Sequence, residues 1–117
     1  MKKLITTCLI AVGMIVSAQV QKEYYPDGKS LKATGDTNNG RAHGEWKIYY
    51  ETGKLMSITN YSNGVTDGLS KSYHENGELM ATGYHKNGLE QGEWKFYNED
   101  GELEETVQYK NGKAKKN

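Results

Sequence analysis

Gly44-Glu45-Trp46-Lys47-Ile48-Tyr49 is the stretch that decides the fold, because it returns further along the chain as Gly92-Glu93-Trp94-Lys95-Phe96-Tyr97. Midway between the two, Gly68-Leu69-Ser70-Lys71-Ser72-Tyr73 keeps the glycine, the lysine and the tyrosine but has lost the tryptophan. Similar stretches at a constant interval, here a period of 24, indicate an internal repeat.

The period of 24 extends over most of the chain. It is kept by several columns of identical residues: Gly40, Gly64, Gly88 and Gly112; Gly53, Gly77 and Gly101; Tyr49, Tyr73 and Tyr97; Leu55, Leu79 and Leu103. The interval from Gly28 to Gly53 is one position longer, so the first unit has an extra residue near Ser30. We divide the array into four units at about residues 24–48, 49–72, 73–96 and 97–117.

Each unit has the pattern of a β-hairpin. Trp94 and Phe96 alternate with Glu93 and Lys95, so one face of the strand is aromatic and the other is charged. Tyr97 breaks this alternation, which predicts a bulge or the end of the strand there. Asn-Gly pairs at positions 39, 63, 76, 87 and 111 supply the positive φ of tight hairpin turns. The frequent glycines argue against helices.

The sequence therefore predicts an all-β fold, an elongated antiparallel meander of four stacked hairpins. We expect eight strands, near residues 20–25, 31–36, 45–50, 54–61, 69–74, 78–85, 93–98 and 102–109. Each hairpin alone cannot bury its aromatic face, so successive hairpins must pack side by side. A compact sandwich is the alternative, but it needs more inward-facing aliphatic residues than the chain offers.

Residues 1–18 have the features of a secretory signal peptide. Lys2 and Lys3 precede an apolar run that ends in Val16-Ser17-Ala18, with small residues at the −3 and −1 positions for cleavage. We expect the mature chain, residues 19–117, to be exported to the periplasm, the cell envelope or the medium. Because Cys8 is the only cysteine, the mature chain has neither a disulfide nor a thiol nucleophile.

The composition of the mature chain limits its core and its partners. All 12 aromatic residues lie after residue 18, whereas Leu, Ile, Val and Phe together number 12 there, so aromatic area must replace an aliphatic core. Without Lys2 and Lys3, 13 basic side chains stand against 15 acidic ones. This charge argues against nucleic acid as a partner and gives no support for lipid contact.

The columns G-x-W-K-x-Y-x-x-x-G-x-L and the later Y-x-N-G resemble the MORN repeat, in its short bacterial variant, whose unit matches the period found here. The resemblance covers about residues 24–112 and rests on two sets of five residues: Trp46, Tyr49, Gly53, Leu55 and Gly64, and Trp94, Tyr97, Gly101, Leu103 and Gly112. It implies a non-catalytic scaffold that contacts proteins or lipids. Similar short bacterial proteins are grouped as YwqK-like antitoxins, which implies binding and blocking a toxin. The chain departs from the pattern at Ser70.

The sequence offers no arrangement typical of catalysis, and we expect no enzyme, no cofactor and no metal site. We interpret His43, His74 and His85 as exposed turn residues, because no pair has the spacing of metal ligands on a strand. Asp36-Thr37-Asn38-Asn39-Gly40 is a turn rather than a calcium loop. The acidic residues Glu102, Glu104 and Glu105 belong to a solvated face, and Ser70 has no base at a meaningful spacing.

The leading functional hypothesis is an exported, non-catalytic binding or scaffold module whose aromatic face engages another protein or an envelope component. The expected binding face consists of one aromatic row and its gap: Trp46, Tyr49, Ser70, Tyr73, Trp94 and Tyr97. Ser70 is either a neutral loss of tryptophan or a notch that receives a partner side chain. The alternatives are an antitoxin or immunity protein, a choline-binding aromatic repeat and, as the third class, an enzyme.

Overall fold

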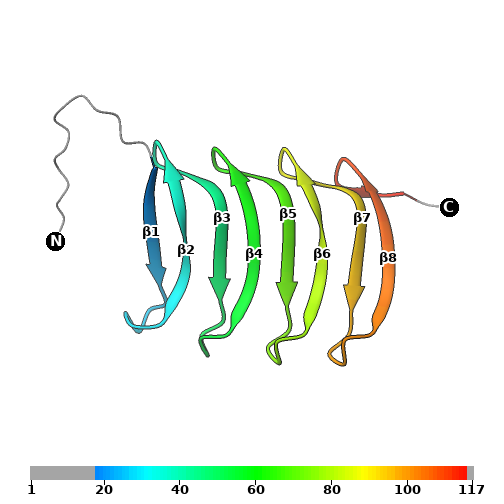
Figure 1. Ribbon diagram of the computed structural model, residues 1–117, viewed down its shortest axis with the longest axis horizontal. Coiled ribbons are helices and arrows are strands. Elements are labelled where there is room, and N and C mark those ends of the chain that lie inside the picture. Colours follow the sequence, from blue (N-terminus) through cyan, green and yellow to red (C-terminus); the bar gives the residue numbers. More distant parts are fainter. Residues whose placement is uncertain (1–17, 116–117) are drawn as a thin grey trace.

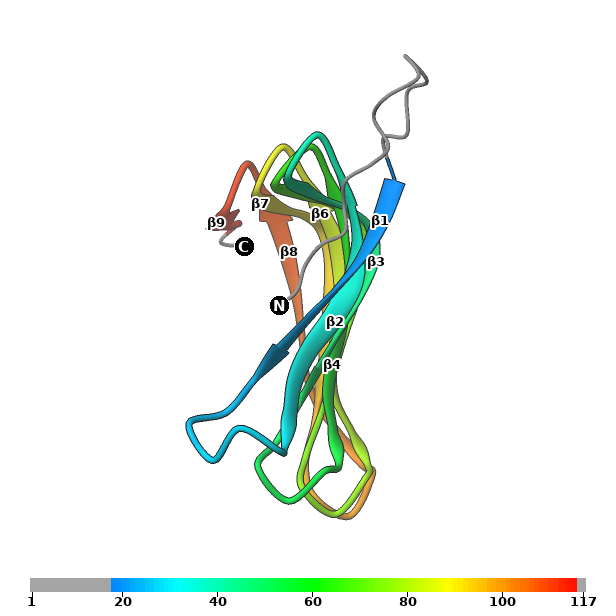
Figure 2. The same ribbon diagram turned by 90° about the vertical axis from the view of Figure 1, so that its left-hand side faces the viewer.

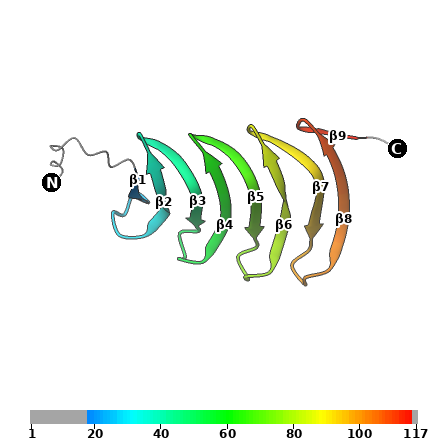
Figure 3. The ribbon, with the colours of Figure 1, turned by 45° about the horizontal axis from the view of Figure 1, so that its top comes forward.

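The chain folds into a single open antiparallel sheet. The computed structural model describes residues 18–115, and its strands lie side by side in the order of the chain (Figures 1 and 3). The nine strands are β1 (Ala18–Tyr24), β2 (Leu31–Asn38), β3 (Arg41–Tyr49), β4 (Leu55–Ser62), β5 (Val65–Tyr73), β6 (Leu79–Lys86), β7 (Leu89–Tyr97), β8 (Leu103–Lys110) and β9 (Lys113–Ala114). The predicted all-β meander is confirmed.

Two-residue Asn-Gly turns join the strands at one end of the sheet. Asn39 and Gly40 have φ of 55° and 80°, and two successive positive values recur in the three equivalent turns at 63–64, 87–88 and 111–112. Two successive positive φ angles are typical of a type I′ turn, whose twist matches that of the flanking strands. The fifth pair, at 76–77, also lies in a turn, but only its glycine has positive φ, so this turn is not of the two-residue type I′ form.

Loops at the other end of the sheet tie each unit to the next one. The Tyr50 hydroxyl donates a hydrogen bond to the Tyr73 carbonyl at 2.6 Å, and the Tyr25 hydroxyl donates to the Tyr49 carbonyl in the same way. His74 takes the place of the tyrosine in the third loop, with Nε2 2.9 Å from the Tyr97 carbonyl oxygen. These contacts recur along the array, so they hold the units in register.

The strands are longer at one end than the sequence predicts. We expected β3, β5 and β7 to begin after the glycines at positions 44, 68 and 92, but each begins three positions before its glycine. Each glycine lies inside its strand with positive φ, at a register shift relative to the preceding strand. A bulge therefore absorbs the glycine without ending the strand. The break predicted at Tyr97 is confirmed by a register shift between Phe96 and Tyr97.

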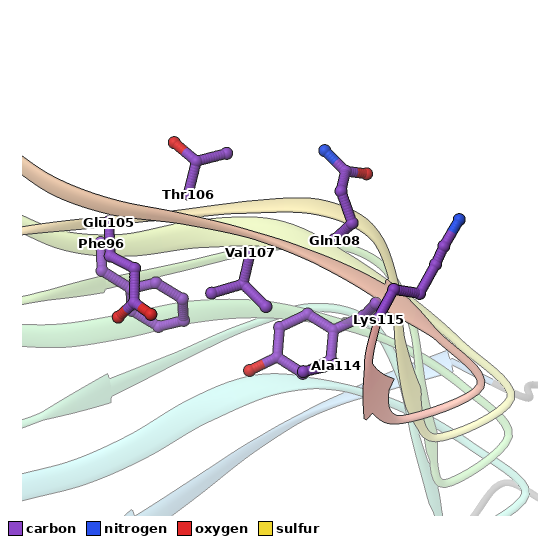
Figure 4. A pocket seen from close by; sticks show the side chains of 8 residues that line it. Phe96, Glu105, Thr106, Val107, Gln108, Ala114 and Lys115 are labelled. Carbon is purple, nitrogen blue, oxygen red and sulfur yellow. The ribbon is translucent and has the colours of Figure 1, made fainter. Parts of the chain in front are cut away.

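The sheet has two distinct faces. Residues that pair across strands share a face, and one cross-sheet row of such residues contains both tryptophans: Gln21, Gly35, Trp46, Thr59, Ser70, Gly83, Trp94 and Val107. We call this side the tryptophan face and the other side the opposite face. Figure 4 shows the division at β8, where Val107 lies on one side of the strand and Thr106 and Gln108 lie on the other.

The sheet is elongated and twisted, and it has little buried core. Its extents are 56 × 31 × 17 Å and its radius of gyration is 17.3 Å, against about 13 Å for a compact domain of about 100 residues. Figure 2 shows the twist as an angle between β1 and β8. Among the described residues the buried apolar side chains are two tryptophans and two alanines: Ala33, Trp46, Ala81 and Trp94. An aromatic core has replaced the aliphatic one, and the compact sandwich is not formed.

None of the elements between residues 18 and 115 is a helix of the length and apolarity needed to cross a membrane. The predicted signal peptide lies outside the described residues, apart from Ala18.

Candidate functional site

The two tryptophans pack in the same way. Each indole lies against the glycine opposite it on the preceding strand, Trp46 over Gly35 and Trp94 over Gly83. The ring N–H of Trp46 donates to the Asp36 carbonyl at 2.8 Å, and that of Trp94 makes the equivalent bond at 3.0 Å. The following strand closes each site with a tyrosine whose ring meets the indole edge to face, at centroid distances of 6.4 and 6.3 Å. A glycine, an indole and a tyrosine thus make one packing unit.

Between the two tryptophans, Thr59, Ser70 and His85 take the places of the glycine, the indole and the tyrosine of this packing unit. Five columns of the tryptophan face read Ala33, Ser57, Ala81; Gly35, Thr59, Gly83; Trp46, Ser70, Trp94; Ile48, Ser72, Phe96; and Tyr61, His85, Tyr109. In each column the outer two members are apolar, aromatic or glycine, and the middle member is a hydroxyl residue or histidine. These five changes lie in one area of the tryptophan face and form a contiguous polar set.

A shallow pocket of about 250 Å³ lies at this polar set. Four hydroxyl residues form its floor as two cross-strand pairs of β4 and β5, Ser57 with Ser72 and Thr59 with Ser70. The wall toward β6 and β7 contains His85, Glu90 and Trp94, and Lys71 also borders the pocket. We call this site the central pocket.

Ser70 and His85 are joined by a hydrogen bond. The Ser70 hydroxyl lies 2.9 Å from His85 Nδ1, and the His85 ring meets the edge of Trp94 at a centroid distance of 5.0 Å. Sequence spacing revealed no base for Ser70, but strand pairing brings residue 85 to the side chain of residue 70. Serine nucleophiles are activated by such a hydrogen bond, in which an imidazole acts as the general base for the hydroxyl.

The surroundings of the pair favour a structural interpretation of this bond. Ser70 is only 6% exposed and lies within a central strand, whereas the serine nucleophiles of α/β-hydrolases stand on exposed turns. A buried hydroxyl needs a hydrogen-bond partner, and the imidazole supplies one. The bond thus satisfies a buried hydroxyl and forms part of the architecture of the pocket.

The histidines differ from the exposed turn residues that we expected. His43 is exposed but lies inside β3, and both His74 and His85 are half-buried and hydrogen-bonded. Between residues 18 and 115 no three side chains of His, Cys, Asp or Glu come together in a group that could hold a metal ion.

The expected binding face divides into two groups. Trp46, Ser70 and Trp94 share one cross-sheet row on the tryptophan face, as described above. The three tyrosines at positions 49, 73 and 97 lie at strand ends, each directly after a register shift, and their carbonyls accept the hydrogen bonds of the loops. The structure thus gives these tyrosine backbones a role in holding the array together.

Sequence reasoning missed Thr59, His85 and the two serines at positions 57 and 72 as parts of the site. The signal was present in the repeat, since each of these residues is the odd member of its column. The acidic residues are as expected, whereas the turn predicted at Asp36 to Gly40 is shorter than expected. Asn39-Gly40 forms a turn, although Asp36 to Asn38 belong to β2, and Glu102, Glu104 and Glu105 are all exposed.

Two further hollows lie at the ends of the sheet. One of about 390 Å³ lies beside β8, lined by Phe96, Val107 and Ala114 among others (Figure 4). The other, of about 330 Å³, lies beside β1 and reaches Trp46. The central pocket differs from both because it lies in the middle of the sheet, where the neighbouring units fill the equivalent space with indole.

Comparison with protein families supports the repeat. The family model described as "MORN repeat variant" matches three successive segments, residues 42–63, 66–87 and 90–111, which together make up more than half of the chain. The chain belongs to the MORN repeat variant family. Each match begins at the second residue of a strand, β3, β5 or β7, and ends just after the next strand. A MORN repeat here is therefore one strand pair of the meander with the loop that joins its two strands.

Comparison of this MORN repeat protein with curated proteins and with solved structures gave no significant match. The family match supports a repeat protein of a kind that can act as a binding module.

Proposed function

We propose that this MORN repeat protein is an exported, non-catalytic module that binds another protein through its tryptophan face. The observation that carries the proposal is the central pocket, where five columns change together from apolar to polar. Neutral substitutions would change the repeat columns independently of one another. These five residues instead line one area of the sheet, and two of them are hydrogen-bonded to each other. A pocket between rigid, buried aromatic units has the form of an interface hot spot.

Export rests on the signal peptide expected in residues 1–18. Intact mass of the protein secreted by its source organism tests this step. A mass that corresponds to residues 19–117 supports export and cleavage after Ala18, and a mature form that still contains Cys8 contradicts it.

A partner capture with matched variants tests the proposed binding. The tagged mature chain is incubated with envelope extract, next to a variant that fills the pocket by restoring the repeat residues, Thr59→Gly with Ser70→Trp. A second variant, Glu93→Gln, alters the opposite face of β7 and is the control. We expect a partner that the filled pocket no longer retains and the control still does. A partner retained equally by all three chains contradicts the proposal.

The identity of the captured partner separates the remaining candidates. A structural component of the envelope favours a scaffold, and a toxin-like protein favours the antitoxin or immunity role of YwqK-like proteins. Turnover of an added substrate that depends on Ser70 and His85 would instead place the chain among enzymes. We include this enzymatic outcome because the Ser70 hydroxyl and His85 are hydrogen-bonded to each other.

A further inference from the structure

Charged side chains are divided unequally between the two faces. One row of cross-strand partners on the opposite face contains four lysines, Lys22, Lys47, Lys71 and Lys95, separated by threonine or isoleucine. The tryptophan face instead carries three glutamates, Glu23, Glu90 and Glu105, which pair with Ala33, His85 and Phe96. The cross-sheet rows that contain Trp46, Ala33 and His85 lie on the tryptophan face. Their paired residues in β1 to β8 include no lysine and no arginine.

The central pocket combines this negative charge with many hydrogen-bond acceptors. Glu90 lies directly across from His85 and is the one acidic residue of the lining, and its Oε1 also lies near Gly112 in the β8–β9 turn. The hydroxyls of the floor each offer acceptor lone pairs, and Trp94 adds an aromatic ring. Lys71 borders the pocket, but its cross-strand partners place its side chain on the opposite face. A carboxylate in a neutral surrounding disfavours an anion and favours a cation.

We propose that the central pocket receives the guanidinium group of an arginine side chain from a protein partner. This proposal rests on the function proposed above and specifies its chemistry. A guanidinium is planar and has five N–H donors, so it can bond to the Glu90 carboxylate and to several hydroxyls at once. It also packs favourably against an indole. A lysine ammonium has three donors around one point and leaves more of the floor without a partner.

Three small probes and a set of variants test the proposal in solution. Backbone and indole N–H signals of the purified protein are followed by NMR during titration with N-acetyl-arginine amide, N-acetyl-citrulline amide or glucose. Citrulline has nearly the shape of arginine but no charge. Because a single side chain supplies few contacts, we expect a Kd in the range of about 1–50 mM for the arginine probe. The shifted signals should include those of Ser70, His85 and the Trp94 indole.

The variants distinguish an effect of the charge in the pocket on arginine binding from an effect on the fold. Glu90→Gln keeps the size of the side chain and should weaken arginine binding about threefold or more, the effect of losing a partly exposed ion pair. Glu93→Gln removes a carboxylate from the opposite face of the same strand and should leave the Kd unchanged. Thr59→Gly with Ser70→Trp should abolish binding by filling the pocket.

Three results would overturn the proposal. They are a citrulline or glucose probe that binds as well as arginine, an arginine affinity that Glu90→Gln does not change, and the absence of saturable shifts up to about 100 mM. A captured partner that depends on the open pocket but not on Glu90 would retain the proposed function and reject the arginine. Arginine binding in a chain that captures no partner through this face would reject the proposed function alone.

Discussion

Gly35 lies directly beneath the indole ring of Trp46, so close that any side chain on residue 35 would enter the ring. The same relationship joins Gly83 to Trp94. Where the tryptophan is absent, at Ser70, the residue in the place of the glycine is Thr59. The two positions keep the same separation in all three places, and both differ at the place without the tryptophan. The rigid unit of this array is the glycine together with the indole that covers it.

Gly35→Ala and Gly83→Ala should each destabilise the array by about 1–3 kcal/mol, as other overpacked sites do. Neither glycine has positive φ, so the loss comes from the displaced ring and not from backbone strain. Denaturant titration followed by tryptophan fluorescence measures it. Thr59→Ala is the control, because it alters the same column where no indole lies opposite. A Gly35→Ala variant as stable as the wild type would show that the indole can move aside freely.

Trp46→Ala and Trp94→Ala should each cost roughly 2–4 kcal/mol of stability, slightly less than the largest core truncations. Both rings are more than nine-tenths buried. Each truncation also leaves a backbone carbonyl, that of Asp36 or Tyr84, without its indole donor. A loss below about 0.5 kcal/mol in the denaturant titration would contradict a core built on these rings.

Asp27 in the first loop should titrate below an ordinary aspartate. Hydrogen bonds from the Ser30 hydroxyl, the Ser30 N–H and the Lys29 N–H hold the pKa of its carboxyl down. A lowered pKa means that the carboxylate stabilises the folded loop at neutral pH and that this contribution is lost as the pH falls through the folded pKa. Ser30→Ala should move the Asp27 pKa upward in an NMR titration. An unchanged pKa would exclude Ser30 as its main cause.

The fold was predictable because its determinants are local. Each Asn-Gly turn and each alternating strand such as Glu93 to Phe96 carries its own signal, and the repeat copies that signal along the chain. The starts of β3, β5 and β7 were not predictable in this way. Glycine weakens a strand, and only the pairing with the preceding strand shows that Gly44 and its equivalents are absorbed as bulges.

The candidate site was only partly predictable, because the pairing register of neighbouring strands brings its residues together. Trp46, Trp94 and the gap at Ser70 follow from the repeat alone. The partners of Ser70 do not, because His85 is distant in sequence and reaches it only through the pairing of β5 with β6. The importance of Thr59 likewise depends on knowing that it lies opposite residue 70.

The repeat pattern alone predicts that Ser70→Trp stabilises the chain. The structure changes that expectation, since an indole at residue 70 would meet Thr59 where the other two indoles meet glycine. We expect Ser70→Trp alone to destabilise the chain by about 1–3 kcal/mol. Thr59→Gly alone should cost about 0.5–1 kcal/mol, because glycine weakens a strand.

The double variant should reverse both losses. Once Thr59→Gly has removed the obstructing side chain, the indole of Ser70→Trp can lie flat and donate its N–H to the Asn60 carbonyl, which has the position of the Asp36 and Tyr84 acceptors. We expect the pair to be about 0.5–2 kcal/mol more stable than the wild type. The favourable coupling in the double-mutant cycle should exceed about 1 kcal/mol. Additive losses would show that the glycine and the indole are not one unit.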